Sequence, residues 1–349
     1  MDSTMTAASV ASLASLTLAT TAATAAAAAP AGAARSTTTA PAAGPVATAG
    51  AATAVAGLVA VPQDPGLSPG VRRITLDAAG VTLSALLSTP EHTAPRATVV
   101  AVHGGGMTAG YFDGQAHPET SLLTLGASLG YTVLAVDRPG YGESAALFPD
   151  GLALAEQAVL LRAALADFTS RYASGAGLFL LAHSYGGKLA LSTCAGLTGE
   201  DGLLGLDISG CGHRFAPSDP QEGLKQTQRH WGPLRLYPQG TFKISTSLVA
   251  PMPALEAGEL GHWTELFAAL APRIRIPIRL TFAEHEAWWH HGDHDLADLA
   301  SRLTAAPRVQ IDRQPDAGHN ISLGWAARSY HLRALAFLED CMTRTGRAA

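Results

Sequence analysis

The sequence predicts an α/β fold, with a mostly parallel, doubly wound sheet and helices on both faces. Short continuous apolar runs recur along the chain, as is typical of strands covered on both sides. Longer stretches with apolar residues at helical spacing separate these runs, and such alternation indicates parallel strands joined by helices. The 349 residues are 47% hydrophobic and 15% charged, so the chain can bury a core large enough for such a sheet.

The elements can be assigned in chain order. Apolar and polar residues alternate over residues 72–87, on both sides of a turn at 78–80, which predicts a hairpin. Buried strands are predicted at 97–102, 132–136, 178–183, 203–209, 276–282 and 308–312. Helices are predicted at 119–129, 152–173, 188–195, 295–303 and 325–342. The folded domain is therefore expected over residues 61–349.

Residues 1–60 form an Ala/Thr-rich leader of low complexity. The leader has no aromatic residue and only one basic residue, Arg35, so we expect it to be disordered. Small residues at 31–33 resemble a signal-peptide cleavage site, but the positive n-region is missing. A cytoplasmic location is favoured, and secretion stays open if the leader is cleaved. No later stretch has the length and apolar content of a membrane span.

The pattern breaks over about residues 212–272, where seven prolines fall. So long an irregular stretch inside a domain is usually functional, and we interpret it as an inserted lid. Its aromatic residues either line an apolar pocket or pack the insertion onto the body of the domain. They are Phe215, Trp231, Tyr237, Phe242, Trp263 and Phe267.

Four motifs follow predicted strands. Three of them are His103-Gly-Gly-Gly, Asp137-Arg-Pro-Gly-Tyr-Gly-Glu-Ser and Gly318-His-Asn. The fourth, Ala182-His-Ser-Tyr-Gly, lies between a strand and a helix. It is the Gly-x-Ser-x-Gly turn that presents a serine hydroxyl above a sheet, with alanine in place of the first glycine.

Together and in this order, the four motifs resemble the α/β-hydrolase superfamily, in particular its serine esterases, lipases and thioesterases. The resemblance extends from about residue 70 to the C-terminus. It implies that Ser184 is the nucleophile and that His319, after the last strand, is the base. A serine hydroxyl needs a base to remove its proton, and the histidine needs a carboxylate to orient it.

The resemblance puts that carboxylate in the loop after the strand at 276–282. Glu286 occupies the position at which relatives more often have Asp, and the chain order Ser–acid–His then fits this fold. Glu284 is the nearest rival, and Asp293 and Asp295 are more distant ones.

An oxyanion formed at the serine needs backbone N–H groups aimed at it beforehand. The expected donors are the amides of Gly105, Gly106 and Tyr185, with Met107 as an alternative. No Gly-Lys-Ser/Thr follows the glycines, so a phosphate-binding loop is disfavoured.

Other features are expected to be structural. Four histidines cluster beside two tryptophans at 285–294, but they lack a His-Glu-x-x-His context, and we interpret them as a solvated loop near the rim of the site. Asp137 and Arg138 are assigned no catalytic role. No cofactor and no metal are predicted, and three widely spaced cysteines form no disulfide framework. The formal charge of −5, without a basic cluster, argues against nucleic-acid binding.

The predicted function is a serine hydrolase that cleaves a carboxylic ester, thioester or lactone through an acyl-enzyme on Ser184. The expected partner is a small molecule with an apolar acyl group. Acyl transfer and amide hydrolysis use the same triad and stay open, as does a non-hydrolytic protein that binds or isomerises a ligand on this fold. The sequence leaves the oligomeric state open.

Overall fold

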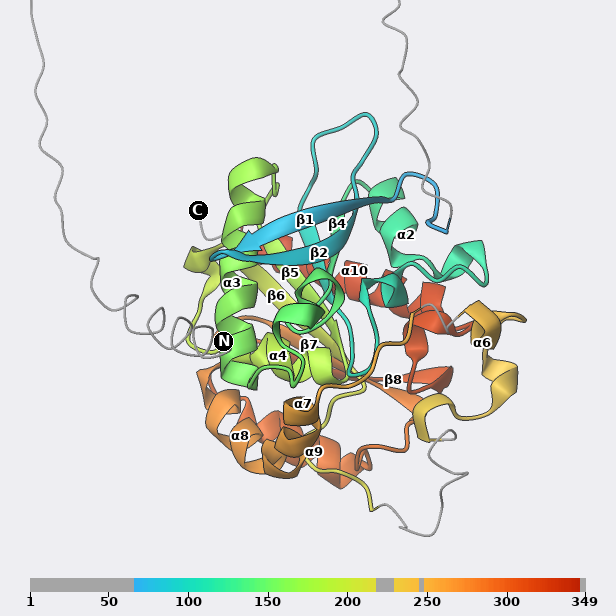
Figure 1. Cartoon of the computed structure of the whole chain (residues 1–349). Helices are drawn as coiled ribbons and strands as arrows, with labels where there is room; N and C mark the ends of the chain where they lie inside the picture. Colours follow the sequence, from blue (N-terminus) through green and yellow to red (C-terminus); the bar gives the residue numbers. More distant parts are fainter. Residues whose placement is uncertain (1–65, 218–228, 245–247, 346–349) are drawn as a thin grey trace, which may run out of the picture. The chain divides into compact units, whose positions relative to one another are not determined.

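An eight-stranded sheet, with strand order β1-β2-β4-β3-β5-β6-β7-β8, forms the centre of the fold (Figure 1). The computed structural model describes residues 66–217, 229–244 and 248–345. The predicted leader at 1–60 lies outside these residues, as do 218–228 and 245–247 of the proposed insertion. The limits of the domain therefore stay predictions.

The hairpin of β1 (Arg72–Ala78) and β2 (Val81–Ser88) joins the sheet antiparallel to β4. The strands from β3 to β8 run parallel to one another. These strands are β3 (Thr98–Val102), β4 (Thr132–Val136), β5 (Leu178–His183), β6 (Leu203–Ser209), β7 (Ile278–His285) and β8 (Val309–Gly318). The predicted fold class is thus confirmed.

Helices pack on both faces of the sheet, and successive residues of a strand face opposite layers. Val100 and Val102 pack with α3 (Leu154–Arg171), α4 (Tyr185–Cys194), α8 (Trp263–Leu270) and α9 (Asp293–Arg302). Val99 and Ala101 pack with α2 (Leu122–Ser128) and α10 (Ala327–Thr345). Burial on both sides explains why these strands are continuous apolar runs. No described helix has the length and apolar content to cross a membrane.

The last strand is longer than predicted. The sequence predicted this strand at 308–312, but β8 continues to Gly318. It can do so because β7 also extends, and His285 pairs with Gly318 after a shift in register. β8 is an edge strand, where proline is tolerated.

The stretch between β6 and β7 is more regular than predicted. It contains α6 (Thr241–Ile244), α7 (Ala254–Glu259) and α8. In α8 the residues Trp263, Phe267 and Leu270 are buried at helical spacing, which the many prolines around them obscured. Trp231, Tyr237 and Phe242 pack against one another, so these aromatic residues hold the stretch together.

A buried histidine in α10 is expected to make stability depend on pH. Burial lowers the pKa of His331 to about 3, whereas in an unfolded chain it is about 6.5. Below pH 6.5 the unfolded state binds a proton that the native state excludes. The free energy of unfolding should then fall by up to about 1.4 kcal/mol per pH unit between pH 6.5 and 3.

Urea denaturation at pH 7, 5.5 and 4.5 measures this effect, with His331→Leu as the comparison. The Nε2 atom of His331 pairs with Ser322 Oγ at 3.0 Å, and no described residue pairs with its Nδ1 atom. Because leucine cannot bind a proton, the variant should lose less stability than the wild type as the pH falls. Parallel pH profiles for the two proteins would contradict the prediction.

Candidate active site

Ser184 stands at a sharp turn between β5 and α4. Its backbone has φ 52° and ψ −117°, a strained conformation for a residue other than glycine. Such strain clusters at functional sites because the surrounding structure must enforce it. Ala182 is the last but one residue of β5 and is fully buried, so a small residue suits this position.

Gly186 is required on the other side of the turn. A methyl group there would lie 2.3 Å from the carbonyl oxygen of Val102 and 2.5 Å from that of His103. Gly186→Ala should therefore push α4 away from β3 and lower the free energy of unfolding by about 3 kcal/mol.

Urea denaturation of this variant tests the prediction, and Gly258→Ala in α7 is the control. No atom lies within 4 Å of a methyl group at position 258, so the control should be unchanged or up to about 1 kcal/mol more stable. Equal stability for both variants would mean that the close approach of α4 to β3 is not needed.

The side chains of Ser184, His319 and Glu286 come together at the carboxyl ends of β5, β8 and β7. Ser184 Oγ lies 3.1 Å from His319 Nε2, and His319 Nδ1 lies 2.8 Å from Glu286 Oε2. His319 and Glu286 are buried. The carboxyl ends of parallel strands meet at one edge of the sheet, which is why residues so distant in sequence can form one hydrogen-bonded chain.

The environment of Glu286 favours its charged form. Burial raises the pKa of its carboxyl, but the charge and hydrogen bond of His319 and the hydrogen bond from the Trp288 N–H together lower it below the usual value. The Trp288 N–H donates to Oε1 at 2.9 Å, so both carboxylate oxygens have partners. This carboxylate can stabilise an imidazolium at His319.

The rival acids make other contacts. Glu284 is exposed and accepts a hydrogen bond from the Asp316 N–H at 2.8 Å. Asp293 pairs with Arg313 at 2.7 Å and Asp295 with Arg214 at 3.2 Å.

The three predicted oxyanion donors differ in their backbone surroundings. Tyr185 is the first residue of α4, so its N–H has no partner within the helix. Gly105 is adjacent, because a methyl group on it would lie 3.6 Å from Tyr185 Cβ. The N–H of Gly106 donates to Tyr141 Oη at 3.2 Å, which argues against the predicted role of this amide.

His103 fixes the backbone of this glycine loop. Its Nδ1 contacts the Gly104 carbonyl at 2.8 Å, and its Nε2 accepts a hydrogen bond from the Arg138 N–H at 3.0 Å. Burial and the charge of Arg138 lower the pKa of His103 well below its usual value. A neutral imidazole is required, since one nitrogen must accept and the other donate.

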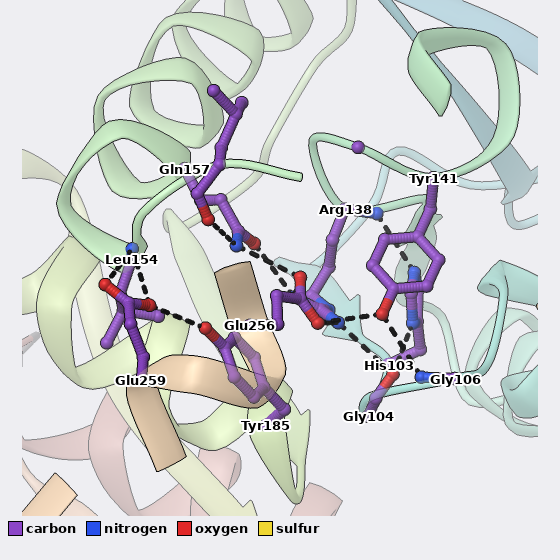
Figure 2. Close-up of polar contacts among 12 residues, drawn as sticks. His103, Gly104, Gly106, Arg138, Tyr141, Leu154, Gln157, Tyr185, Glu256 and Glu259 are labelled. Atoms are coloured by element: carbon purple, nitrogen blue, oxygen red, sulfur yellow. Dashed lines mark hydrogen bonds and ion pairs between the residues drawn. The ribbon is translucent and has the colours of Figure 1, made fainter. Parts of the chain in front are cut away.

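A buried ionic cluster, not predicted from the sequence, ties α7 to the body (Figure 2). The two terminal guanidinium nitrogens of Arg138 donate to Glu256 in α7, at 2.7 and 2.9 Å. Glu256 also accepts hydrogen bonds from Tyr141 and Gln157, at 2.8 and 3.0 Å. Glu259, one turn later, accepts from the Tyr185 hydroxyl at 2.9 Å. The cluster thus connects α7 with the glycine loop, through Tyr141, and with the start of α4, through Tyr185.

A cavity of about 90 Å³ opens beside the serine. The stretch between β6 and β7 contributes Phe215, His230, Met252 and Leu260 to its lining. Burial, with the charges of His319 and Arg229, lowers the pKa of His230 to about 4, so this imidazole is neutral at pH 7. A larger hollow of about 690 Å³ beside β1 and β2 includes neither Ser184 nor His319, so it is not the reactive site.

The histidines at 285–294 lie where the sequence suggested, in the segment from the end of β7 into α9. Three are half-buried and His294 is exposed. His291 Nδ1 contacts the Trp289 carbonyl at 3.0 Å. Among the described residues, no group of three or more His, Cys, Asp or Glu side chains is arranged to hold a metal ion. All three cysteines are free and buried.

Solved structures with the same fold have diverse activities. A carboxyl esterase from Bacillus coagulans is 16% identical with a TM-score of 0.57, and the match covers 79% of this chain and 100% of that one. An epoxide hydrolase from Vigna radiata is 15% identical with a TM-score of 0.54, and the match covers 78% of this chain and 98% of that one. An AqdC variant that cleaves the ring of the Pseudomonas quinolone signal is 16% identical with a TM-score of 0.56. The match covers 77% of this chain and 99% of that one. Such identities show the fold alone.

No curated protein matches the sequence significantly. The profile of the alpha/beta hydrolase family matches residues 99–332, which is more than half of the chain. This segment includes Ser184, Glu286, His319 and the glycine loop. The chain therefore belongs to the alpha/beta hydrolase family.

Proposed function

We propose that this protein is a serine hydrolase that cleaves carboxylic esters through an acyl-enzyme on Ser184. The observation that carries the proposal is the hydrogen-bonded chain from Ser184 Oγ to His319 Nε2, at 3.1 Å, and from His319 Nδ1 to Glu286, at 2.8 Å. These are the distances that a nucleophile, its base and an orienting acid need.

In the first half of the reaction, Ser184 Oγ attacks the ester carbonyl carbon while its proton moves to His319 Nε2. Glu286 stabilises the imidazolium, and the N–H groups of Gly105 and Tyr185 bind the oxyanion. The carbon–oxygen bond to the leaving group then breaks. His319 gives its proton to the departing alcohol, and the acyl group remains on Ser184.

In the second half, water attacks the acyl-enzyme and gives a proton to His319. The oxyanion forms again and collapses, the bond to Ser184 breaks, and the serine recovers its proton. The products are the acid and the alcohol. Thioesters and lactones fit the same sequence of steps, and an acyltransferase would use an alcohol or amine in place of water.

The stretch between β6 and β7 would act as a lid that sets substrate selectivity. Four of its residues line the cavity, and Met252 lies against the oxyanion loop, since a methyl group on Gly105 would meet its Cε at 3.2 Å. The Glu256 cluster would hold α7 in place during the reaction.

Intact-mass labelling with a fluorophosphonate tests the proposal, on the wild type and on Ser184→Ala in parallel. One adduct on the wild type and none on the variant is the expected result. Short methyl esters should then be hydrolysed by the wild type alone, as measured by pH-stat. A folded wild type that takes up no label would refute the serine hydrolase function.

A further inference from the structure

A buried lysine lies in the cavity beside the proposed nucleophile. Lys188 is on α4, four residues after Ser184, and residues at this spacing lie on one face of a helix. It lines the cavity together with Ser184 and His319, although the residue as a whole is only 3% exposed. A lysine so deeply buried is unusual unless it is paired.

Aromatic rings surround the ammonium. Its Nζ atom lies 4.8 Å from the ring centre of Phe215 and 5.0 Å from that of Trp263. Tyr185 and Trp289 follow at 5.4 and 5.5 Å. Ring faces attract a cation, but an ammonium also has three N–H donors that need acceptors. Within the described part of the chain, Lys188 forms no ion pair and no hydrogen bond.

The nearby carboxylates are engaged elsewhere (Figure 2). Glu256 binds Arg138 through both oxygens. Glu259 accepts from the Tyr185 hydroxyl and from the Leu154 N–H, at 2.9 and 3.1 Å. Burial lowers the pKa of Lys188 to about 8, so the ammonium remains mostly protonated at pH 7. The charges of Glu259 and Glu256 also act on this ammonium, but no described carboxylate is in contact with it.

The cavity has room for a polar group beside the ammonium. Its volume of about 90 Å³ is several times the roughly 10–15 Å³ that one water molecule needs. A short group that ends in a carboxylate fits this space. A carboxylate would give the ammonium charge-assisted hydrogen bonds in a setting that excludes water.

We propose that Lys188 binds a carboxylate of the substrate, and that the substrate is a short ester whose acid portion ends in that carboxylate. Half-esters of short dicarboxylic acids belong to this class. The inference rests on the proposed esterase function of Ser184. It replaces the apolar acyl group that the sequence alone suggested.

A pair of isosteric esters tests the proposal. Monomethyl succinate carries the carboxylate, and methyl 4-methylpentanoate has an uncharged branched end of the same shape. At pH 7 the wild type should prefer the charged ester in kcat/KM. Lys188→Met should lower kcat/KM for the charged ester about 10- to 100-fold, mainly through KM, and change it less than about threefold for the uncharged one.

Methionine keeps the length of the side chain and its contacts with the rings, so the variant should melt no lower than the wild type. If Lys188→Met lowered kcat/KM equally for both esters, or if the wild type showed no preference for the charged ester, Lys188 would be only a packing residue. Fluorophosphonate labelling of Ser184 separates this result from a failure of the hydrolase proposal. Calorimetry with succinate, expected to bind the wild type and not Lys188→Met, tests the charge site without turnover.

Discussion

His319→Gln should lower kcat for ester hydrolysis about 10⁶-fold, and Glu286→Gln should lower it about 10⁴-fold. Without His319, no described residue within hydrogen-bond distance can take the Ser184 proton, because the His319 Nε2 is the partner of Oγ at 3.1 Å. Without the carboxylate, the imidazole loses the partner of Nδ1 and with it the tautomer that leaves Nε2 free to accept. The base should therefore matter more than the acid that orients it.

Rates of methyl ester hydrolysis by pH-stat measure both effects. His294→Gln is the control, since this histidine is exposed on α9. The double variant His319→Gln/Glu286→Gln should be no slower than His319→Gln, because the two side chains act as one unit. If Glu286→Gln had no effect while His319→Gln did, the acid would have to be reassigned.

The second large effect concerns stability. Arg138→Met should lower the free energy of unfolding by about 3–5 kcal/mol, because it leaves the Glu256 carboxylate buried without its cation. Both side chains are fully buried. Tyr141 and Gln157 would still donate to Glu256, but neutral donors do not balance its charge.

Urea denaturation of Arg138→Met, Glu256→Met and the double variant measures this effect. The double variant should be less destabilised than the sum of the single ones, because no unpaired charge remains. Arg308→Met is the matched control. Its partner Asp340 lies 2.9 Å away and is half-exposed. The free energy of unfolding should therefore fall by less than about 1 kcal/mol. If the losses in free energy of unfolding of the two single variants simply added in the double variant, Arg138 and Glu256 would act independently.

The central sheet could be predicted from the sequence because its signals are local. Each strand from β3 to β6 is a continuous apolar run, and each was expected within about a residue of its observed limits. Ser184 and His319 directly follow β5 and β8 and belong to short motifs that contain glycine, so local patterns single them out. Glu286 was harder to assign, since Glu284 has the same chemistry two residues away. The difference between them lies in where each side chain points.

Other parts depend on contacts between distant residues. The helix α8 was missed because prolines surround it, and its burial against α4 outweighs that local signal. Gly106 looked equivalent to Gly105 until Tyr141 was found to accept its N–H. Arg138 was expected to be structural, but its partner could not be predicted. Glu256 lies 118 residues away, and no pattern in the sequence joins the two.

The sequence by itself determined the order of the strands, the main helices outside residues 212–272, the serine turn and the residues that can supply nucleophile and base. These depend on spacing and residue type within short segments. The tertiary structure alone decided that Tyr141 accepts the N–H of Gly106, which acid meets His319, and that Lys188 is a buried cation in the cavity. The physical reason is that burial, hydrogen-bond partners and charge balance are set by neighbours in space. For this chain those neighbours come from strands and helices far apart in sequence.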